Sequence, residues 1–536
     1  MVQLLVLLLF LFFCFGRFVY AKKVERIFDI DPNRKTPAHT KYDAIDFVPA
    51  KHWTILFGHH FSSIAGAAPV IGPILAICWW GWGPAVIWVL LGSVFLGGVH
   101  DFCSLIISVK HGGCSIADIA SKHLTKNAKT IFLIFLWFTL ILIVAVFASV
   151  CAKTLVVSPN IVVPSIGLIP LALVVGFLMN YKGWSQLWVS IIGVAALVLL
   201  MIIGHYFPLA INVQDPILLW KIILFIYALI ASICPVQILL QPRDYLSSFL
   251  MFFGIFFGYA GIMFFSNSIN LPFFIGYTAK PDNLNLFPFL FVTIACGAIS
   301  GFHSIVSTGT SSKQLANEKD AINIGYGAMI AEAILAVMTI IIVIVGFDKM
   351  ETLQVMISNK GQGPISAFGY SYGAITKRFL GSYGYIFAIT LLNAFILTTL
   401  DTATRLCRYI TQDLFSIKDR YFATIIVVVF AGWLSISGKW EQLWPLFGAA
   451  NQLIGALSLI VISSWLLVRK KPVLFTLIPM FFILIVAMGA LLYQLSGFLK
   501  TGEYVLFIID IILFLLSGFV FIDAAKSTVA VVRSRK

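Results

Sequence analysis

Long apolar runs are the feature that most constrains the fold of this chain. A helix needs about 20 apolar residues to cross a bilayer. Fifteen runs come close to or exceed that length, near residues 2–20, 53–78, 83–109, 131–157, 161–179, 185–204, 217–240, 248–267, 288–307, 321–346, 380–401, 421–437, 441–468, 473–494 and 504–524. The sequence therefore predicts an all-α polytopic membrane protein with about fifteen transmembrane helices. Its mean hydropathy of +1.00 excludes an ordinary soluble domain.

The basic residues predict the orientation of these spans. One set of alternate loops holds 27 of the 36 lysines and arginines, and the opposite set holds 7. Because short cytoplasmic loops collect Lys and Arg, the N-terminus is predicted outside and the C-terminus in the cytoplasm. The net charge of +14 lies in short loops rather than on one helical face, which argues against nucleic acid as a partner.

The same spans predict the organisation of the chain. A signal peptidase could cleave near residue 20, but cleavage would strand the following basic loop on the wrong side of the membrane. An uncleaved N-terminal anchor is therefore expected. The predicted parts are an anchor at 1–20, a basic cytoplasmic loop at 21–52, membrane repeats at 53–267 and 288–524, and a basic cytoplasmic tail at 525–536.

Two spans carry too many glycine, proline and polar residues for helices that only face lipid. They are WTILFGHHFSSIAGAAPVIGPILAIC, which begins at Trp53, and PFLFVTIACGAISGFHSIVSTGTSS, which begins at Pro288. Backbone groups freed by such residues are tolerated at membrane depth only where they line a cavity or contact protein. We therefore expect a break in the helix near Gly66 and another near Gly301.

The two interrupted spans share a pattern of glycine, histidine and serine, and the charge count predicts that they cross the membrane in opposite senses. Opposite crossing is typical of inverted repeats in transporters. A seven-plus-seven repeat and a five-plus-five core with added helices both fit the number of spans. Two unrelated packing helices rich in small residues are the alternative.

The polar residues of the two spans are the predicted solute-binding residues. A half-helix that begins at a break presents N–H groups that favour a carboxylate. The predicted binding residues are His59, His60, Ser62, Ser63, Gly66, Gly301, His303, Ser304, Ser307 and Thr308. Ionisable residues inside a membrane are usually functional, so His60, His303 and Asp101 are the predicted sites of a coupling proton or cation. A plain ion pair of Asp101 with Lys110 or with a neighbouring histidine is the alternative.

Two charged pairs lie near the predicted cytoplasmic ends of spans. Asp401 and Arg405 are four residues apart on one helical face, which predicts an ordinary ion pair. Arg243 and Asp244 follow Pro242 in a predicted cytoplasmic turn, where they would form an interfacial anchor or a gate.

Several further polar residues lie inside apolar spans. The amides Asn451 and Gln452 are predicted to form hydrogen bonds between helices. Glu332, Lys153 and Asp510 are lone ionisable residues to which the sequence assigns no partners. The eight cysteines form no CxxC pair and are predicted to be free.

These stretches resemble the carbon starvation protein A family of bacterial inner-membrane transporters. FGHHFSSIAGAAPVIGP, PRDYL, TIACGAISGFHSIVSTGT with LANEKDAINIGYGAM, ILTTLDTATRLCRYITQDL and LWPLFGAANQ follow the family's order over most of Asp43–Ser463. His100 departs from the glutamine that is usual in the family.

The resemblance implies a secondary transporter that imports peptides or pyruvate during nutrient limitation, driven by a proton or cation gradient. It also implies a fold similar to the amino-acid, polyamine and organocation superfamily. The expected partners are thus a small carboxylate-bearing nutrient, a coupling proton or cation and the lipid bilayer. No cofactor or metal is expected, and the lack of a Walker A motif argues against ATP as the energy source.

The rival hypothesis is a membrane-embedded metal or haem enzyme that uses His59, His60 and His303 as ligands. Imidazoles from two facing helices could form such a site. Neither an H-E-x-x-H motif nor a cysteine cluster accompanies these histidines, which argues against the enzyme.

Overall fold

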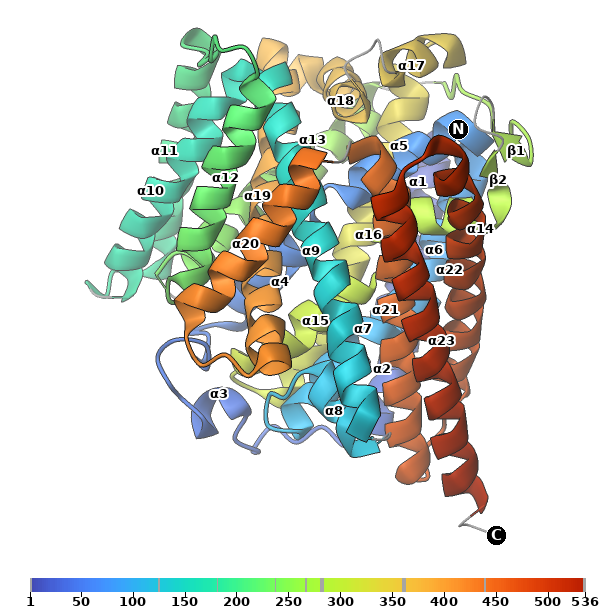
Figure 1. The fold of residues 1–536 in the computed structure, drawn as a ribbon. Helices are drawn as coiled ribbons and strands as arrows, with labels where there is room; N and C mark the ends of the chain where they lie inside the picture. The colour runs from blue at the N-terminus through green and yellow to red at the C-terminus, as the bar shows by residue number, and fades with distance from the viewer. Residues whose placement is uncertain are drawn as a thin grey trace.

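The computed structural model describes residues 2–123, 126–180, 182–236, 238–265, 268–279, 284–358, 363–437 and 440–533. Residues 534–536 of the predicted basic tail lie outside the described part. The fold is a bundle of long helices with a two-stranded antiparallel sheet at one end (Figure 1). All eight cysteines are free, as predicted.

The first half of the chain supplies the helices α1 (Val2–Phe15), α2 (Ala21–Glu25), α3 (Pro37–Thr40), α4 (Trp53–Ala65), α5 (Ala68–Trp80), α6 (Trp82–Leu91), α7 (Gly98–Lys110), α8 (Ile116–His123), α9 (Lys126–Val157), α10 (Val162–Asn180), α11 (Gln186–Tyr206), α12 (Pro216–Ile233) and α13 (Leu240–Phe265).

The second half begins with the strands β1 (Thr278–Ala279) and β2 (Leu284–Asn285). It continues with the helices α14 (Leu286–Thr293), α15 (Gly301–Gly309), α16 (Ala321–Gly346), α17 (Met350–Ile357), α18 (Pro364–Leu380), α19 (Gly384–Phe415), α20 (Arg420–Ser437), α21 (Trp440–Val468), α22 (Leu474–Thr501) and α23 (Tyr504–Arg533).

Fourteen helices in the described part are long and apolar enough to cross a membrane. The predicted span at 288–307 is not among them, because residues 294–300 are irregular and divide it into α14 and α15. The fold is therefore the predicted polytopic helical one with about fifteen crossings. The two chain ends lie at opposite ends of the molecule (Figure 1), as an odd number of crossings requires.

The two broken helices run in opposite directions. In Figure 1, α4 lies below α5, whereas α14 lies above α15. Residues 58–78 of α4 and α5 are all buried by other parts of the chain, whereas most of α11 and α12 is left on the outside. The breaks therefore lie inside the bundle rather than against lipid.

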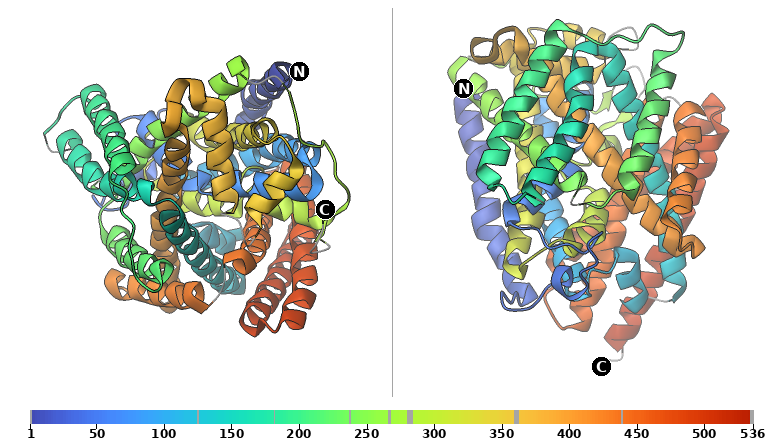
Figure 2. Two further views of the ribbon diagram at one scale, coloured as in Figure 1. Left: turned by 90° about the horizontal axis from the view of Figure 1, so that it is seen from above. Right: turned by 90° about the vertical axis from the view of Figure 1, so that its left-hand side faces the viewer.

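Helices from both halves of the chain pack together in the centre of the bundle. α4 packs against α13 and α16, and α15 packs against α7 and α21. Further contacts join α7 with α16, α9 with α19, and α12 with α20. The hairpin of α10 and α11 lies at one side of the bundle and α22 and α23 at the other (Figures 1 and 2).

Candidate functional site

The first break lies at Gly66 and Ala67, where α4 ends and α5 begins. Gly66 has a φ of 32°, which side chains other than glycine rarely adopt. A Cβ atom at this position would lie 2.8 Å from the ring of Phe147 on α9. Both observations explain why the chain has glycine here, and the predicted break near Gly66 is confirmed.

The second break is held by the amide side chain of Asn451 on α21. The Asn451 Oδ1 atom accepts hydrogen bonds from the Phe302 backbone N–H at 2.8 Å and from the Ser300 hydroxyl at 3.2 Å. Gln452 donates to the Phe291 carbonyl at 2.5 Å. The predicted hydrogen bonding of these two amides between helices is confirmed. One of the N–H groups at the start of α15 is therefore already satisfied by protein.

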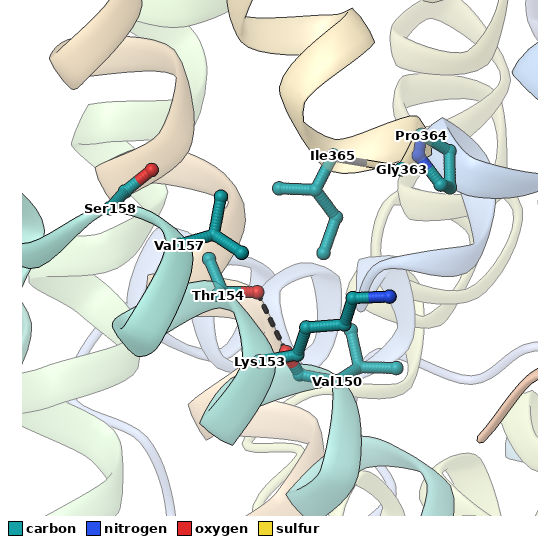
Figure 3. Close-up of a pocket in the computed structure, with 8 residues that line it drawn as sticks. All are labelled: Val150, Lys153, Thr154, Val157, Ser158, Gly363, Pro364 and Ile365. Atoms are coloured by element: carbon teal, nitrogen blue, oxygen red, sulfur yellow. Dashed lines mark hydrogen bonds between the residues drawn. The ribbon is translucent and has the colours of Figure 1, made fainter. Parts of the chain in front are cut away.

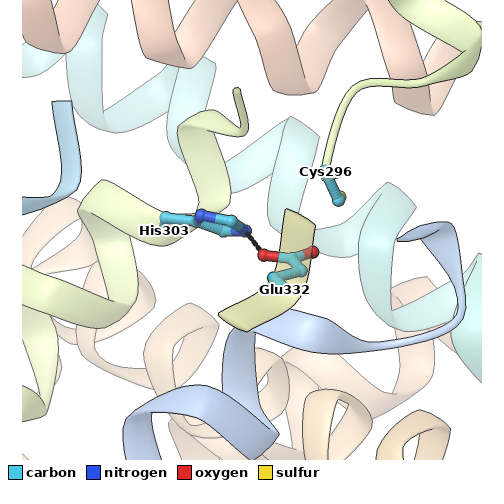
Figure 4. Close-up of side chains that lie close together, drawn as sticks. All are labelled: Cys296, His303 and Glu332. Atoms are coloured by element: carbon cyan, nitrogen blue, oxygen red, sulfur yellow. Dashed lines mark ion pairs between the residues drawn. The ribbon is translucent and has the colours of Figure 1, made fainter. Parts of the chain in front are cut away.

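The first cluster of ionisable residues surrounds Asp101 on α7. His303 Nδ1 donates to one Asp101 oxygen at 2.8 Å, and His100 Nδ1 donates to the other at 2.8 Å. The His303 Nε2 atom lies 3.3 Å from a Glu332 oxygen (Figure 4). All four side chains are fully buried. The partner of Asp101 is therefore a neighbouring histidine and not Lys110.

The second cluster joins α4, α12, α13 and α19. His59 Nδ1 donates to Asp244 Oδ2 at 2.6 Å, and Arg243 donates to Asp244 Oδ1 at 2.7 Å. Arg243 also forms an ion pair with Asp401, and the Tyr227 hydroxyl donates to Asp401 Oδ2 at 2.5 Å. Two acids, one arginine and one histidine are thus buried together.

The predicted interfacial turn at Arg243 and Asp244 is wrong. Both residues lie within the first two turns of α13 and are buried. Pro242 does not break this helix, because a proline in the first turn removes only an N–H group that has no partner within the helix.

The predicted ion pair of Asp401 with Arg405 is also wrong. Arg405 donates instead to Asp46 at 3.2 Å, and Asp401 forms an ion pair with Arg243. The sequence revealed only the spacing along one helix, whereas both partners come from other segments of the chain. Stronger buried partners therefore replace the pair at i and i+4.

Asp46 joins the loop before α4 to the end of α19. Tyr409 donates to Asp46 at 2.5 Å, and the Lys313 ammonium lies 4.2 Å from the centre of the Tyr409 ring. Burial alone would raise the pKa of Asp46, but the charges of Lys313 and Arg405 and the Tyr409 hydroxyl hold this pKa below its usual value. The acid is thus ionised at neutral pH and ties the loop to the bundle.

Most predicted solute-binding side chains have protein partners. The Ser62 hydroxyl donates to the Asp244 carbonyl at 3.0 Å, and the Ser63 hydroxyl is 3.1 Å from that of Thr402. Ser304 is 2.8 Å from Ser458. Two further contacts are made by His60 with Ser311, at 2.7 Å, and by Thr308 with the Ser304 carbonyl, at 2.8 Å.

Three polar atoms of the predicted set remain without a hydrogen-bond partner among the described residues. They are the Ser307 hydroxyl, the His60 Nε2 atom and the His303 Nε2 atom, all fully buried. A buried polar atom is costly to leave unpaired. Because His303 Nε2 faces Glu332 at 3.3 Å, the His60 and Ser307 atoms are the best placed of the set to bind a solute.

The sequence pattern shared by the two spans does not mark equivalent positions. His59 and His60 lie before the first break, whereas His303 lies after the second. Because the spans run in opposite directions, α4 and α15 both lie toward the end of the molecule that carries α3 (Figure 1). The histidines therefore gather on one side of the breaks.

Four residues with direct roles in these contacts were not assigned partners from the sequence. Glu332 is a lone intramembrane acid, which is itself a signal of function, but spacing along the chain does not identify its partner. Asp46, Tyr227 and Tyr409 carry no motif of their own. Their partners lie far away along the chain and become adjacent only through folding.

A small cavity lies between the end of α9 and the start of α18 (Figure 3). Its volume of about 10 Å³ holds roughly one water molecule. Lys153 is the one charged residue among those that line it, and the walls include Val150, Val157 and Ile365. This cavity is too small for an organic solute.

Comparison with known proteins shows the relationship of the chain. The model of the family described as carbon starvation protein CstA matches residues 1–361 and 348–490. The peptide transporter CstA of Campylobacter jejuni is 32% identical over 88% of this chain and 76% of its own. The pyruvate/proton symporter BtsT of Escherichia coli is 31% identical over 88% of this chain and 80% of its own.

Solved structures show a similar fold. A manganese transporter of Eremococcus coleocola, in complex with an aromatic bis-isothiourea compound, aligns with a TM-score of 0.51. The alignment covers 91% of this chain and 99% of that one, at 12% identity. This likeness concerns the helical transporter fold alone.

Proposed function

We propose that this chain, which belongs to the carbon starvation protein CstA family and is a multi-pass membrane transporter, imports a small carboxylate-bearing nutrient together with protons. The nutrient is a peptide or pyruvate. One relative is named a peptide transporter, and another is named a pyruvate/proton symporter. These names support both the solute class and the coupling ion.

The charge balance of the second cluster carries the proposal of proton coupling. Asp244 and Asp401 contribute two negative charges, and Arg243 contributes one positive charge. A protonated His59 brings the buried cluster to zero net charge, whereas a neutral His59 leaves it at minus one. Because an uncompensated buried charge is strongly unfavourable, the proton on His59 stabilises this arrangement of helices.

The contacts of His59 explain how its proton could act on helix positions. In the protonated ring both nitrogens donate, Nδ1 to Asp244 on α13 and Nε2 to the Thr310 hydroxyl after α15, at 3.1 Å. Loss of the proton removes one of these donors and unbalances the charges beside Asp401 on α19. Protonation is thereby linked to contacts among α4, α13, α15 and α19.

The solute site is proposed at the two breaks, with the ten residues predicted from the sequence as its lining. The carboxylate would meet the start of α5 and the unpaired polar atoms of His60 and Ser307. Helix N-termini favour an anion by about 0.3 to 2 kcal/mol. The assignment of the coupling proton to His60, His303 and Asp101 stays a prediction, and we prefer His59 because of the charge balance.

Uptake into proteoliposomes tests the proposal. Labelled pyruvate and a labelled dipeptide are offered with and without an inward proton gradient, and uptake is normalised to inserted protein. We expect accumulation of at least one of them by the unmodified chain. In His59→Gln, exchange of labelled for unlabelled solute should persist, while accumulation driven by the gradient is lost.

His205→Gln is the matched control, because His205 lies on α11 at the side of the bundle. It should accumulate solute normally. Full gradient-driven accumulation by His59→Gln would contradict the coupling role of this residue. Failure of the unmodified, inserted chain to take up either compound would contradict the solute class.

A further inference from the structure

Three side chains with metal-binding atoms converge beside the second break. Cys296 lies in the irregular segment, His303 in the first turn of α15 and Glu332 on α16 (Figure 4). The sulfur, a ring nitrogen and a carboxylate oxygen all lie within 4.8 Å of one another. Cys296 is 3% exposed, and the other two are fully buried.

The ring of His303 is held in the orientation that metal-binding histidines adopt. Its Nδ1 atom donates to Asp101, whose other oxygen accepts from His100. The neutral ring therefore carries its proton on Nδ1 and directs the lone pair of Nε2 at Glu332. A carboxylate that accepts from the far nitrogen is the usual support of a histidine ligand.

The atoms that face the centre of this cluster lack hydrogen bonds. In the described part of the chain, His303 Nε2 and both oxygens of Glu332 have no hydrogen-bond partner. Two such acceptors 3.3 Å apart repel each other unless a proton or a cation lies between them. A proton would join only these two groups, whereas a cation would also use the sulfur of Cys296.

One hydrogen-bond donor approaches the sulfur of Cys296. The Asn451 side-chain amide donates to the sulfur at 3.4 Å, and the Cys296 thiol donates to the Ser300 hydroxyl at 3.5 Å. A donor to the sulfur stabilises the thiolate that a metal ion requires. Asn451 also fixes the start of α15, so the second ligand is held relative to the first.

We propose that Cys296, His303 and Glu332 bind one divalent transition-metal ion, with Zn²⁺ as the preferred species. Thiolate and imidazole ligands favour this class over Mg²⁺, Ca²⁺ or Na⁺. Zinc–ligand bonds of about 2.0 to 2.3 Å fit the cluster after a small contraction. Binding releases the thiol proton to solvent, and three protein ligands leave a fourth position for water or a carboxylate.

The ion would join the irregular segment and α15, which follow each other directly, to α16. It would therefore stabilise the second break in the conformation seen here. This inference does not depend on the transported solute or on the proton on His59, and its test measures metal rather than transport.

The test is zinc binding by the purified full chain. Protein in nanodiscs is treated with chelator and equilibrated with Zn²⁺, and bound metal per chain is measured by elemental analysis. We expect about one zinc per unmodified chain and at least a 10-fold loss of affinity in Cys296→Ser and in Glu332→Gln. Zn²⁺ should also raise the melting temperature of the unmodified chain and leave that of both variants unchanged.

Two controls match the substitutions at buried positions outside the cluster. Cys407→Ser removes another buried thiol, and Asp510→Asn removes another buried lone acid on α23. Both should bind zinc as the unmodified chain does. Equal zinc binding by Cys296→Ser, or no zinc bound by the unmodified chain, would overturn the site.

Cobalt gives an independent readout that requires no variant to fold. Co²⁺ bound to the unmodified chain should show the charge-transfer absorption of a cobalt–thiolate bond. If Co²⁺ binds without this absorption, the proposed ligand set is wrong.

Discussion

Asp46 is a single residue whose ionisation holds two segments together, the loop before α4 and the end of α19. We predict that Asp46→Asn lowers the free energy of unfolding by about 1 to 3 kcal/mol at pH 7, because hydrogen bonds to a buried charge have this magnitude. Thermal unfolding of the detergent-purified protein measures the change. Asp348→Asn, at an exposed acid, should have no effect.

The loss of stability caused by Asp46→Asn should depend on pH. The pKa of Asp46 is held below its usual value in the folded state. Its stabilising contribution is therefore complete above the unfolded-state pKa of about 3.9 and is lost as the pH falls through the lower, folded-state value. The difference between Asp46→Asn and the unmodified protein should stay constant from pH 7 to 5 and shrink below pH 4. A difference that grows on acidification would contradict this assignment.

Individual residues show where sequence reasoning succeeds. Asp101 could be expected to meet a histidine, because an acid in a membrane span needs a partner and few candidates exist. The true partners of Arg243 and Arg405 could not be expected, since Arg243 pairs with Asp401 over 158 residues and Arg405 with Asp46 over 359. Hydrophobic periodicity and spacing carry no information on such distant contacts.

Among the elements, the start of α15 gives the sharpest test of packing. A Cβ atom at Gly301 would collide with the Asn451 carbonyl and the Gly455 nitrogen on α21. We predict that Gly301→Ala lowers stability by roughly 1 to 3 kcal/mol or more and reduces the yield of inserted protein. Size-exclusion profiles and melting temperature measure this effect.

Gly455 provides the control from the opposite side of the same contact. A Cβ atom there would lie 3.6 Å from the nearest atom, which is an ordinary contact distance. Gly455→Ala should therefore insert and melt like the unmodified protein. If both substitutions are tolerated equally, α15 and α21 do not pack as described.

The helices of the two halves of the chain can also be matched with each other as repeats. We propose a five-plus-five core, in which the helices of residues 53–110, 126–157 and 216–265 correspond to those of 286–346, 384–415 and 420–468. The paired packing of counterparts supports this division. The hairpin of α10 and α11 is then an insertion in the first repeat. The sequence left the seven-plus-seven alternative open because span counting cannot separate a repeat from an insertion.

For the whole molecule, the distribution of charge predicts the topology. A reporter fused after Lys35 should be cytoplasmic, and one fused after Met350 should be external, because cytoplasmic loops collect Lys and Arg. Alkaline phosphatase and fluorescent protein fusions in cells measure the two locations. If both reporters lie on one side, the number of crossings between them is wrong.

The architecture was more predictable from the sequence than the site. Apolar length alone indicated the membrane helices, since backbone hydrogen bonds must be satisfied within each span. Glycine and proline indicated both breaks. The clusters at Asp101 and Asp244 depend on which faces of the helices meet, and the shared histidine pattern was misleading because α4 precedes its break and α15 follows its own.

The position of α4 and α15 on one side of the breaks has an electrical consequence. With the α3 end in the cytoplasm, as the basic loops predict, α4 and its residue His59 lie toward the cytoplasmic side of the breaks (Figure 1). A proton that arrives from outside would then cross a part of the voltage drop before it binds. Each elementary charge gains about 2.3 kcal/mol per 100 mV of full membrane potential. A voltage of about 100 mV would therefore favour protonation of this site by roughly 1 to 2 kcal/mol, even where the two solutions have the same pH.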